Sequence, residues 1–139
     1  MKISARVHNS AGMHSAIVRT NENAQTVSIS AKSTGLGSSV NGGELLFLAL
    51  ATCYCNDIYR EAAKMSIAVQ RVVVEVEGEF GGPGEPGRNI TYRAKVAAPA
   101  ASREQIQQRL ERTDQVAEIH NTLRAGTPVT FTGFEMMDV

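Results

Sequence analysis

Two cysteines, Cys53 and Cys55, lie two residues apart near the middle of the 139-residue chain. A cysteine thiolate can act as a nucleophile or a redox centre, so both residues are candidates for catalysis. On a helix, residues two apart point about 200° away from each other, so the two thiols cannot line one pocket or form a disulfide. Cys53 borders the polar Asp57, whereas Cys55 lies beside the apolar Ile58. Cys53 is therefore the candidate catalytic residue and Cys55 a predicted core residue; the alternative is that both are inert core side chains.

A reactive thiol in the middle of a helix needs a nearby cation that stabilises its thiolate. The sequence offers Lys32, just before a glycine-rich segment, and His120, in the C-terminal part of the chain. A structural histidine whose ring nitrogens are satisfied by hydrogen bonds is the alternative interpretation of His120. Asp57, one turn after Cys53, would instead raise the thiol pKa. The sequence thus supplies a candidate nucleophile and leaves its activating partner open.

Composition and spacing argue against several kinds of ligand. None of the histidines, His8, His14 and His120, has the spacing to the cysteines that zinc ligands show, so we expect no metal site and no cofactor. Fourteen Lys and Arg residues balance fourteen Asp and Glu residues, which argues against nucleic-acid partners. No apolar stretch approaches the roughly 20 residues that cross a bilayer, and the first residues lack the apolar core of a secretory signal. We therefore expect a cytoplasmic protein without nucleic-acid or membrane partners.

The segment 44–65 contains neither Pro nor Gly and predicts a long helix that carries both cysteines. Its first half, residues 45–51, is apolar on every side, which predicts burial all round. A chain of this length has one core and little material to cover such a helix. We therefore expect a second copy of the chain to supply part of the cover, in a homodimer.

The remaining chain predicts short strands and helices separated by turns rich in glycine, proline and asparagine. In chain order we expect a hairpin over 14–31, a loop over 33–43, strands over 68–80 and 89–97, helices over 102–112 and 113–125, and a final strand over 127–136. Ser102 and Gln105 form a capping-box pattern, Thr113 is the predicted N-cap of the second of these helices, and Gly126 ends it. This order indicates an α+β fold with an antiparallel sheet and helices on one face, in a single domain over residues 1–139.

A family resemblance is carried by the segment NGGELLFLALATCYCNDIYREAAKMSI and by the valine-rich VQRVVVEVEGEF that follows it. These residues resemble the OsmC/Ohr superfamily of osmotically induced and organic hydroperoxide resistance proteins, in which Glu-Leu-Leu leads to Ala-Ala-Cys inside a long central helix. Here Glu44-Leu45-Leu46 leads to Ala51-Thr52-Cys53. The resemblance implies an OsmC-like domain over residues 1–139, with antiparallel sheets, a long buried central helix and an intertwined homodimer.

The resemblance also implies a thiol peroxidase site at the subunit interface. In active members of the family, a peroxidatic cysteine attacks an organic hydroperoxide, becomes a sulfenic acid and is resolved by a second cysteine. Cys53 matches the peroxidatic position. Three other parts of the pattern are missing: Gly43 replaces the acid that supports a catalytic arginine, Lys32 is the only cation where that arginine is expected, and Ala117 stands at the position of the resolving cysteine.

Two functional hypotheses follow. In the first, this OsmC-like stress-response protein is a peroxidase that reduces organic hydroperoxides through Cys53, with an external thiol as the reductant. In the second, the chain is a catalytically degenerate family member that acts as a binding or stress-associated dimeric protein. Cys53 is then retained for packing, because a fold can persist after its activity is lost.

Overall fold

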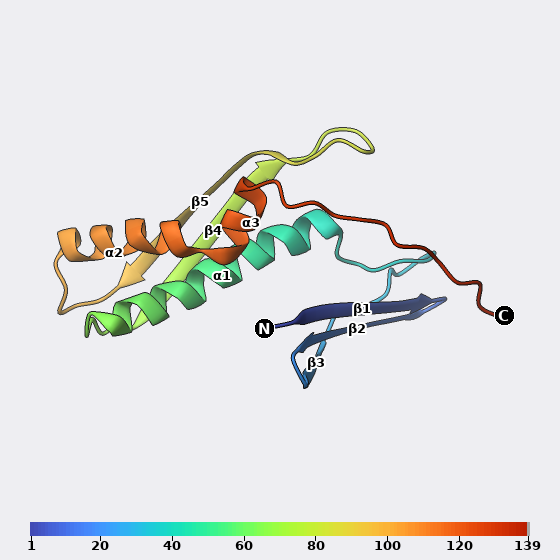
Figure 1. Ribbon diagram of the computed structural model, residues 1–139, viewed down its shortest axis with the longest axis horizontal. Coiled ribbons are helices and arrows are strands. Elements are labelled where there is room, and N and C mark those ends of the chain that lie inside the picture. The colour runs from blue at the N-terminus through green and yellow to red at the C-terminus, as the bar shows by residue number, and fades with distance from the viewer. Residues whose placement is uncertain (139) are drawn as a thin grey trace. The chain divides into compact units, whose positions relative to one another are not determined.

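The computed structural model describes residues 1–138, which form two compact units, residues 1–46 and 47–138 (Figure 1). The helices and strands of the described residues are β1 (Ile3–Ser10), β2 (Met13–Thr20), β3 (Asn23–Val27), α1 (Gly42–Lys64), β4 (Arg71–Glu79), β5 (Arg88–Ala97), α2 (Arg103–Val116) and α3 (Glu118–Arg124). The strands pair in antiparallel fashion, so the expected α+β class with antiparallel sheets is confirmed. No helix within residues 1–138 has the length and apolar character needed to cross a membrane.

The first unit contains a three-stranded antiparallel sheet in the order β1-β2-β3. Gly12 (φ +72°) lies in the turn between β1 and β2, and Asn21 (φ +49°) lies in the turn between β2 and β3. Both turns use left-handed backbone, which glycine and asparagine adopt more readily than other residues. The hairpin predicted over 14–31 is confirmed as β2 and β3. β1 was not predicted, although the alternation of apolar and polar residues from Ile3 to Val7 is a signal for it.

The second unit packs helices against one face of the β4-β5 hairpin. The side chains that meet there are Tyr54, Ile58, Val72, Val74, Tyr92, Ala94, Val96, Leu110 and Ala117. The two strands predicted by alternation are confirmed: Val72 and Val74 are partly buried, whereas Val73 between them and Arg71 and Glu75 on either side are exposed. In Figure 1, α1 and α2 lie on the same side of β4 and β5, as expected for helices on one face of a sheet.

α1 matches the predicted central helix and begins two residues earlier. Asn41 caps it, because its Oδ1 accepts from the Glu44 N–H (2.9 Å) and its Nδ2 donates to Glu44 Oε1 (2.6 Å). Burial on all sides of its first half is not present within one chain: Leu50 is buried, but Leu48 is 59% exposed and Leu45 is 37% exposed. The β4-β5 hairpin can cover only one side of α1. Burial of its other sides by a second copy of the chain therefore stays a prediction.

The capping box predicted at the start of α2 is confirmed. Ser102 Oγ accepts from the Gln105 N–H, and Gln105 Oε1 accepts from the Ser102 N–H. The second N-cap predicted at Thr113 is wrong, because Thr113 is buried inside α2 and its hydroxyl donates to the Arg109 carbonyl (2.7 Å). The helical path instead breaks at Ala117, whose extended backbone separates α2 from α3.

The final strand predicted over 127–136 is wrong. Gly126 (φ +61°) does end the helical region as predicted. Beyond it, the described residues form no strand, because a β-ladder needs a neighbouring strand and no described strand of the chain pairs with this segment. Val129 is 98% exposed and Phe131 is 83% exposed. The apolar side chains of this segment therefore lie on the surface of the single chain.

Candidate active site

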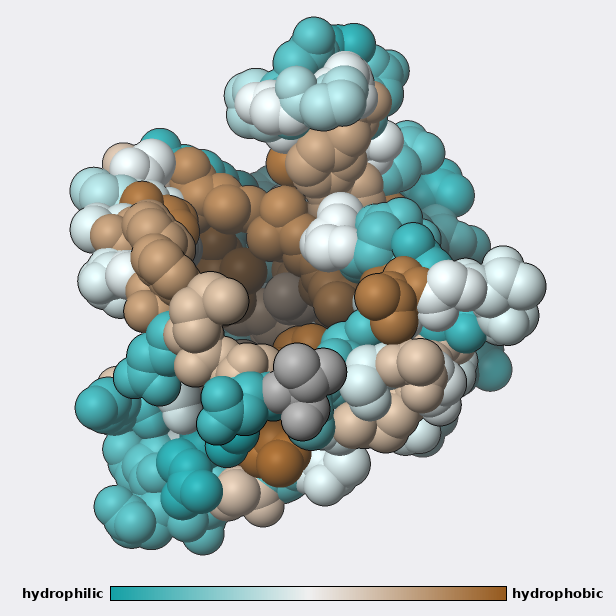
Figure 2. Space-filling model, turned by 90° about the vertical axis from the view of Figure 1, so that its right-hand side faces the viewer, coloured by the Kyte–Doolittle hydropathy of each residue, from teal (hydrophilic) through white to brown (hydrophobic). Residues whose placement is uncertain are grey.

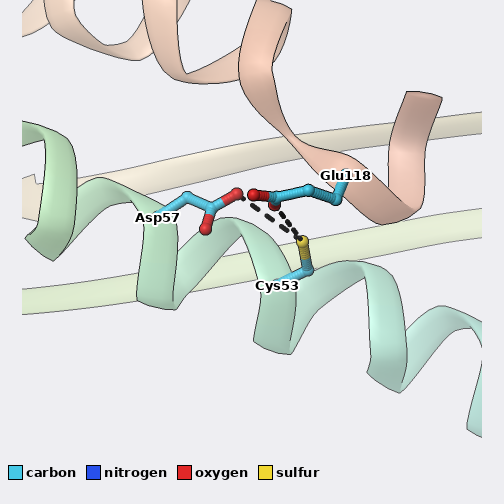
Figure 3. A group of neighbouring side chains, drawn as sticks. All are labelled: Cys53, Asp57 and Glu118. Carbon is cyan, nitrogen blue, oxygen red and sulfur yellow. Dashed lines mark hydrogen bonds between the residues drawn. The ribbon is translucent and has the colours of Figure 1, made fainter. Parts of the chain in front are cut away.

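Cys53 lies in the middle of α1, next to the start of α3. Its Sγ lies 3.6 Å from Asp57 Oδ2 and 3.8 Å from Glu118 Oε2, and the thiol donates in both contacts. Figure 3 shows both carboxylates pointing toward the sulfur. The thiol is half-buried and is not part of a disulfide. The site therefore joins a free thiol to two hydrogen-bond acceptors.

Two different features position these carboxylates. Asp57 follows Cys53 by four residues, so helical geometry alone places both side chains on one face of α1. Glu118 is the first residue of α3 and follows the break at Ala117. Ala117 is completely buried in the cluster that contains Tyr54. This core contact fixes the start of α3, and with it the carboxylate that reaches the thiol.

Arg60 bonds the remaining oxygen of each carboxylate. Its Nη1 lies 3.0 Å from Asp57 Oδ1 and 3.4 Å from Glu118 Oε1. Each carboxylate thus uses one oxygen for the guanidinium and the other for the thiol. Neither Arg60 nor Glu118 was predicted from the sequence as a site residue. The three-residue spacing of Asp57 and Arg60 on a helix is a signal for Arg60. For Glu118 there is no local signal, because only the tertiary fold places it next to Cys53.

The surroundings of the thiol stabilise its protonated form. Burial raises the pKa of Cys53, a hydrogen bond with the Ile119 backbone opposes this, and the charges of Asp57 and Glu118 raise the pKa further. Burial and the charge of Glu118 also raise the pKa of Asp57, against the effect of Arg60. The pKa of Glu118 is lowered by a hydrogen bond with its own backbone and by Arg60. At neutral pH the thiol is therefore protonated and donates to carboxylates.

His120 lies in the core and makes no hydrogen bond to the thiol. Its ring centroid lies 4.6 Å from that of Tyr92 and 5.7 Å from that of Tyr54. Both ring nitrogens are buried without a hydrogen-bond partner in residues 1–138. Burial lowers the pKa of His120, the positive charge of Arg124 lowers it further, and Asp114 opposes them. His120 is therefore buried, as expected for a structural histidine, but the expectation that its ring nitrogens are hydrogen-bonded is wrong within the described residues.

Lys32, Cys55 and Gly43 were also singled out in the sequence. Lys32 lies in the first unit, where its backbone N–H donates to the Gly37 carbonyl (3.0 Å). Cys55 is half-buried, is also a free thiol, and lines a shallow hollow with Val74. Gly43, in the first turn of α1, provides no carboxylate.

The ligand atoms of Cys53, Asp57 and Glu118 lie within 4.8 Å of one another, a spacing at which such groups could hold a metal ion. Arg60 already bonds both carboxylates and supplies the positive charge that a cation would bring. The contacts that are present therefore describe a hydrogen-bonded thiol with two acceptors and a guanidinium behind them.

Comparison with known families decides where this chain belongs. A family model described as OsmC-like protein matches residues 35–132. The chain belongs to the OsmC-like family. The matched range contains Cys53, Asp57, Arg60 and Glu118, so the whole site lies in the part that defines membership. The family predicted from the residues around Cys53 is thus confirmed.

Solved structures with a similar fold include three that share little sequence with this OsmC-like chain. An OsmC-like protein from Mycoplasma pneumoniae has a TM-score of 0.64 and 20% identity, over 88% of this chain and 86% of that chain. An OsmC-like protein of unknown function from Vibrio cholerae has a TM-score of 0.61 and 16% identity, over 88% and 93%. An organic hydroperoxide resistance protein OsmC from Legionella pneumophila has a TM-score of 0.57 and 13% identity, over 89% and 90%. These likenesses support the fold alone, and no curated protein matches the sequence.

Proposed function

We propose that this OsmC-like protein acts in a stress response by reducing organic hydroperoxides through Cys53. The supporting observation is a half-buried free thiol, hydrogen-bonded to Asp57 and Glu118, in the central helix of an OsmC-like chain. The Legionella neighbour is described as an organic hydroperoxide resistance protein, and that activity is carried to this chain as part of the proposal.

The proposed reaction transfers the terminal peroxide oxygen to the Cys53 sulfur. The thiol becomes a sulfenic acid and the hydroperoxide leaves as an alcohol. Cys55 projects from a different side of α1, and Ala117 has no thiol, so neither residue can resolve the sulfenic acid. An external thiol condenses with it, which releases water and forms a mixed disulfide. A second external thiol then displaces the first and restores Cys53.

We also propose that the protein is an intertwined homodimer. Leu48 on α1, and Val129 and Phe131 beyond α3, are exposed in the single chain. Figure 2 shows apolar residues exposed on the surface that it presents. Exposed apolar surface of this kind is typical of a protein interface, and burying each such side chain contributes about 1.5–3 kcal/mol. The family model spans parts of both compact units, which supports one OsmC-like domain over residues 1–139.

One observation favours the second candidate function, a binding or stress-associated dimer without catalysis. The nucleophilic form of cysteine is the thiolate, and the pKa of Cys53 is raised by burial and by two carboxylates. On either hypothesis we place the protein in the cytoplasm, where free thiols such as Cys53 and Cys55 stay reduced.

Hydroperoxide consumption with a sulfenic-acid trap separates the two functions. The reduced protein is treated with cumene hydroperoxide, and the trapped adduct is located by mass spectrometry. We expect consumption and an adduct at Cys53 in the wild type, loss of both in Cys53→Ser, and retention of both in the matched control Cys55→Ser. A wild type that consumes no hydroperoxide and carries no adduct would favour the non-catalytic dimer.

A further inference from the structure

We infer that Asp57 is the general base of the site: its carboxylate takes the proton from the Cys53 thiol during attack on the hydroperoxide and returns it to the departing alkoxide. This inference rests on the proposed peroxidase function and adds a catalytic residue to it. Asp57 touches the reacting sulfur, with 3.6 Å between Oδ2 and Sγ.

The position of Asp57 is suited to proton transfer. It lies one turn after Cys53 on the same helix, so the backbone of α1 fixes the distance between the two side chains. Its side chain is only 5% exposed, which keeps water from competing for Oδ2. Arg60 bonds Oδ1 at 3.0 Å and leaves Oδ2 for the thiol. A base within hydrogen-bond reach of the proton, with its orientation held by a third group, is the arrangement that general-base catalysis requires.

Glu118 is the weaker candidate for the same role. Its Oε2 lies farther from the sulfur, at 3.8 Å, and its side chain is 64% exposed. Its pKa is lowered, whereas that of Asp57 is raised, so Asp57 is the stronger base of the two. Between two carboxylates that contact one thiol, the buried one with the higher proton affinity accepts the proton more readily.

The charges around the sulfur explain why a base is needed. From α1 the sulfur faces Asp57, and from α3 it faces Glu118 and the backbone of Ile119. The guanidinium of Arg60 bonds the carboxylate oxygens that face away from the thiol, not the sulfur itself. A thiolate formed before the attack would therefore lie beside two negative charges. Loss of the proton during the attack avoids that state.

The proposed step balances in atoms and electrons. The S–H bond breaks and its proton moves to Asp57 Oδ2, while a sulfur electron pair forms a bond to the terminal peroxide oxygen. The O–O bond breaks and leaves its electron pair on the alkoxide, which takes the proton from Asp57. Cys53 is oxidised to a sulfenic acid, the hydroperoxide is reduced to an alcohol, and Asp57 is again a carboxylate. The external thiol acts only in the later resolution.

Asp57→Asn tests this role against the alternative that Asp57 affects the thiol only through its negative charge. The two hypotheses predict opposite changes in the rate at which Cys53 reacts with hydroperoxide. Both predict faster alkylation of Cys53 by iodoacetamide at pH 7, since a negative charge beside the thiol is lost. As the base, Asp57 is required for attack, so Asp57→Asn should form the trapped sulfenic acid about 100-fold more slowly with cumene hydroperoxide. The isosteric Glu118→Gln should speed both reactions. All assays contain a chelator, so that a metal ion cannot supply the activity.

Each outcome has a distinct meaning. An active wild type with an Asp57→Asn variant that reacts with hydroperoxide as fast or faster would overturn the base while leaving the peroxidase intact. An unreactive wild type would overturn the proposed function itself. If Asp57→Asn does not fold, two measurements on the wild type test the base. Proton transfer during attack requires that Cys53 reacts with hydroperoxide more slowly in D₂O than in H₂O. It also requires that the rate of this reaction does not rise tenfold per pH unit from pH 6 to 8. A preformed thiolate would show that rise and would overturn the inference.

Discussion

The guanidinium of Arg60 lies 3.0 Å from Asp57, across one turn of α1, and is its main source of compensating charge. Because the Asp57 side chain is 5% exposed and that of Arg60 is 45% exposed, the pair straddles the protein surface. Arg60→Gln should leave a buried carboxylate with one acceptor oxygen unpaired. We expect the free energy of unfolding to fall by about 1–2 kcal/mol at pH 7, measured by urea denaturation.

The loss in Arg60→Gln should shrink in acid. Arg60 opposes the rise in the pKa of Asp57, so the part of its contribution that comes from Asp57 is present only while that carboxylate is ionised. Protonation of Asp57 at low pH removes the charge that Arg60 compensates. The control is Arg112→Gln on α2, which removes an exposed contact with Gln115 (3.2 Å) and should change stability by less than about 0.5 kcal/mol. Equal losses in the two variants would contradict a special role for Arg60.

The Cys53 thiol should be slow to alkylate at neutral pH. Burial and two carboxylates raise its pKa above the ordinary value for a cysteine, so its thiolate fraction at pH 7 is smaller than that of a free thiol. The rate of reaction with iodoacetamide, followed from pH 7 to 11 in a Cys55→Ser background, should rise with an inflection above that of glutathione. An inflection below that of glutathione would mean that the thiol is activated.

Replacing Leu48 by Asp should separate the proposed dimer. Leu48 is 59% exposed on the apolar first half of α1. In the proposed dimer, the carboxylate introduced by Leu48→Asp would be buried against the second copy without a charged partner. Light scattering should report two chains for the wild type and one for Leu48→Asp at micromolar concentration. Gln108→Asp, an exposed position on α2, should keep the wild-type mass. A monomeric wild type would remove the basis of the dimer proposal.

His120 should make stability depend on pH. Burial and Arg124 lower its pKa below the usual 6.5, so between the folded value and 6.5 the unfolded chain holds a proton that the folded chain lacks. Stability should therefore fall as pH falls through 6.5 and level off below the folded pKa. His120→Phe keeps an aromatic ring against Tyr54 and Tyr92 and should flatten this part of the curve. If the urea midpoint falls equally in the wild type and in His120→Phe as the pH is lowered through 6.5, other groups cause the pH dependence.

Local patterns predicted the elements whose signals lie within a few residues. The helix that carries Cys53 follows from a long segment without Pro or Gly, and the capping box at Ser102 follows from two residues three apart. The same kind of pattern was wrong at Thr113, because a hydroxyl inside a helix can donate to a carbonyl four residues earlier instead of capping a new helix. The strand predicted over 127–136 was also wrong, because a segment by itself does not supply the neighbouring strand that pairing requires.

By itself, the sequence determined the family, the helix that carries Cys53, and the shared helical face of Cys53 and Asp57, since all of these depend on residues close along the chain. Only the tertiary structure decided that Glu118, 65 residues after Cys53, contacts the same thiol. Only it showed Arg60 joining the two carboxylates. The proton affinity of the sulfur depends on burial and on charges that meet once α3 packs on α1, and no local pattern of residues contains that information.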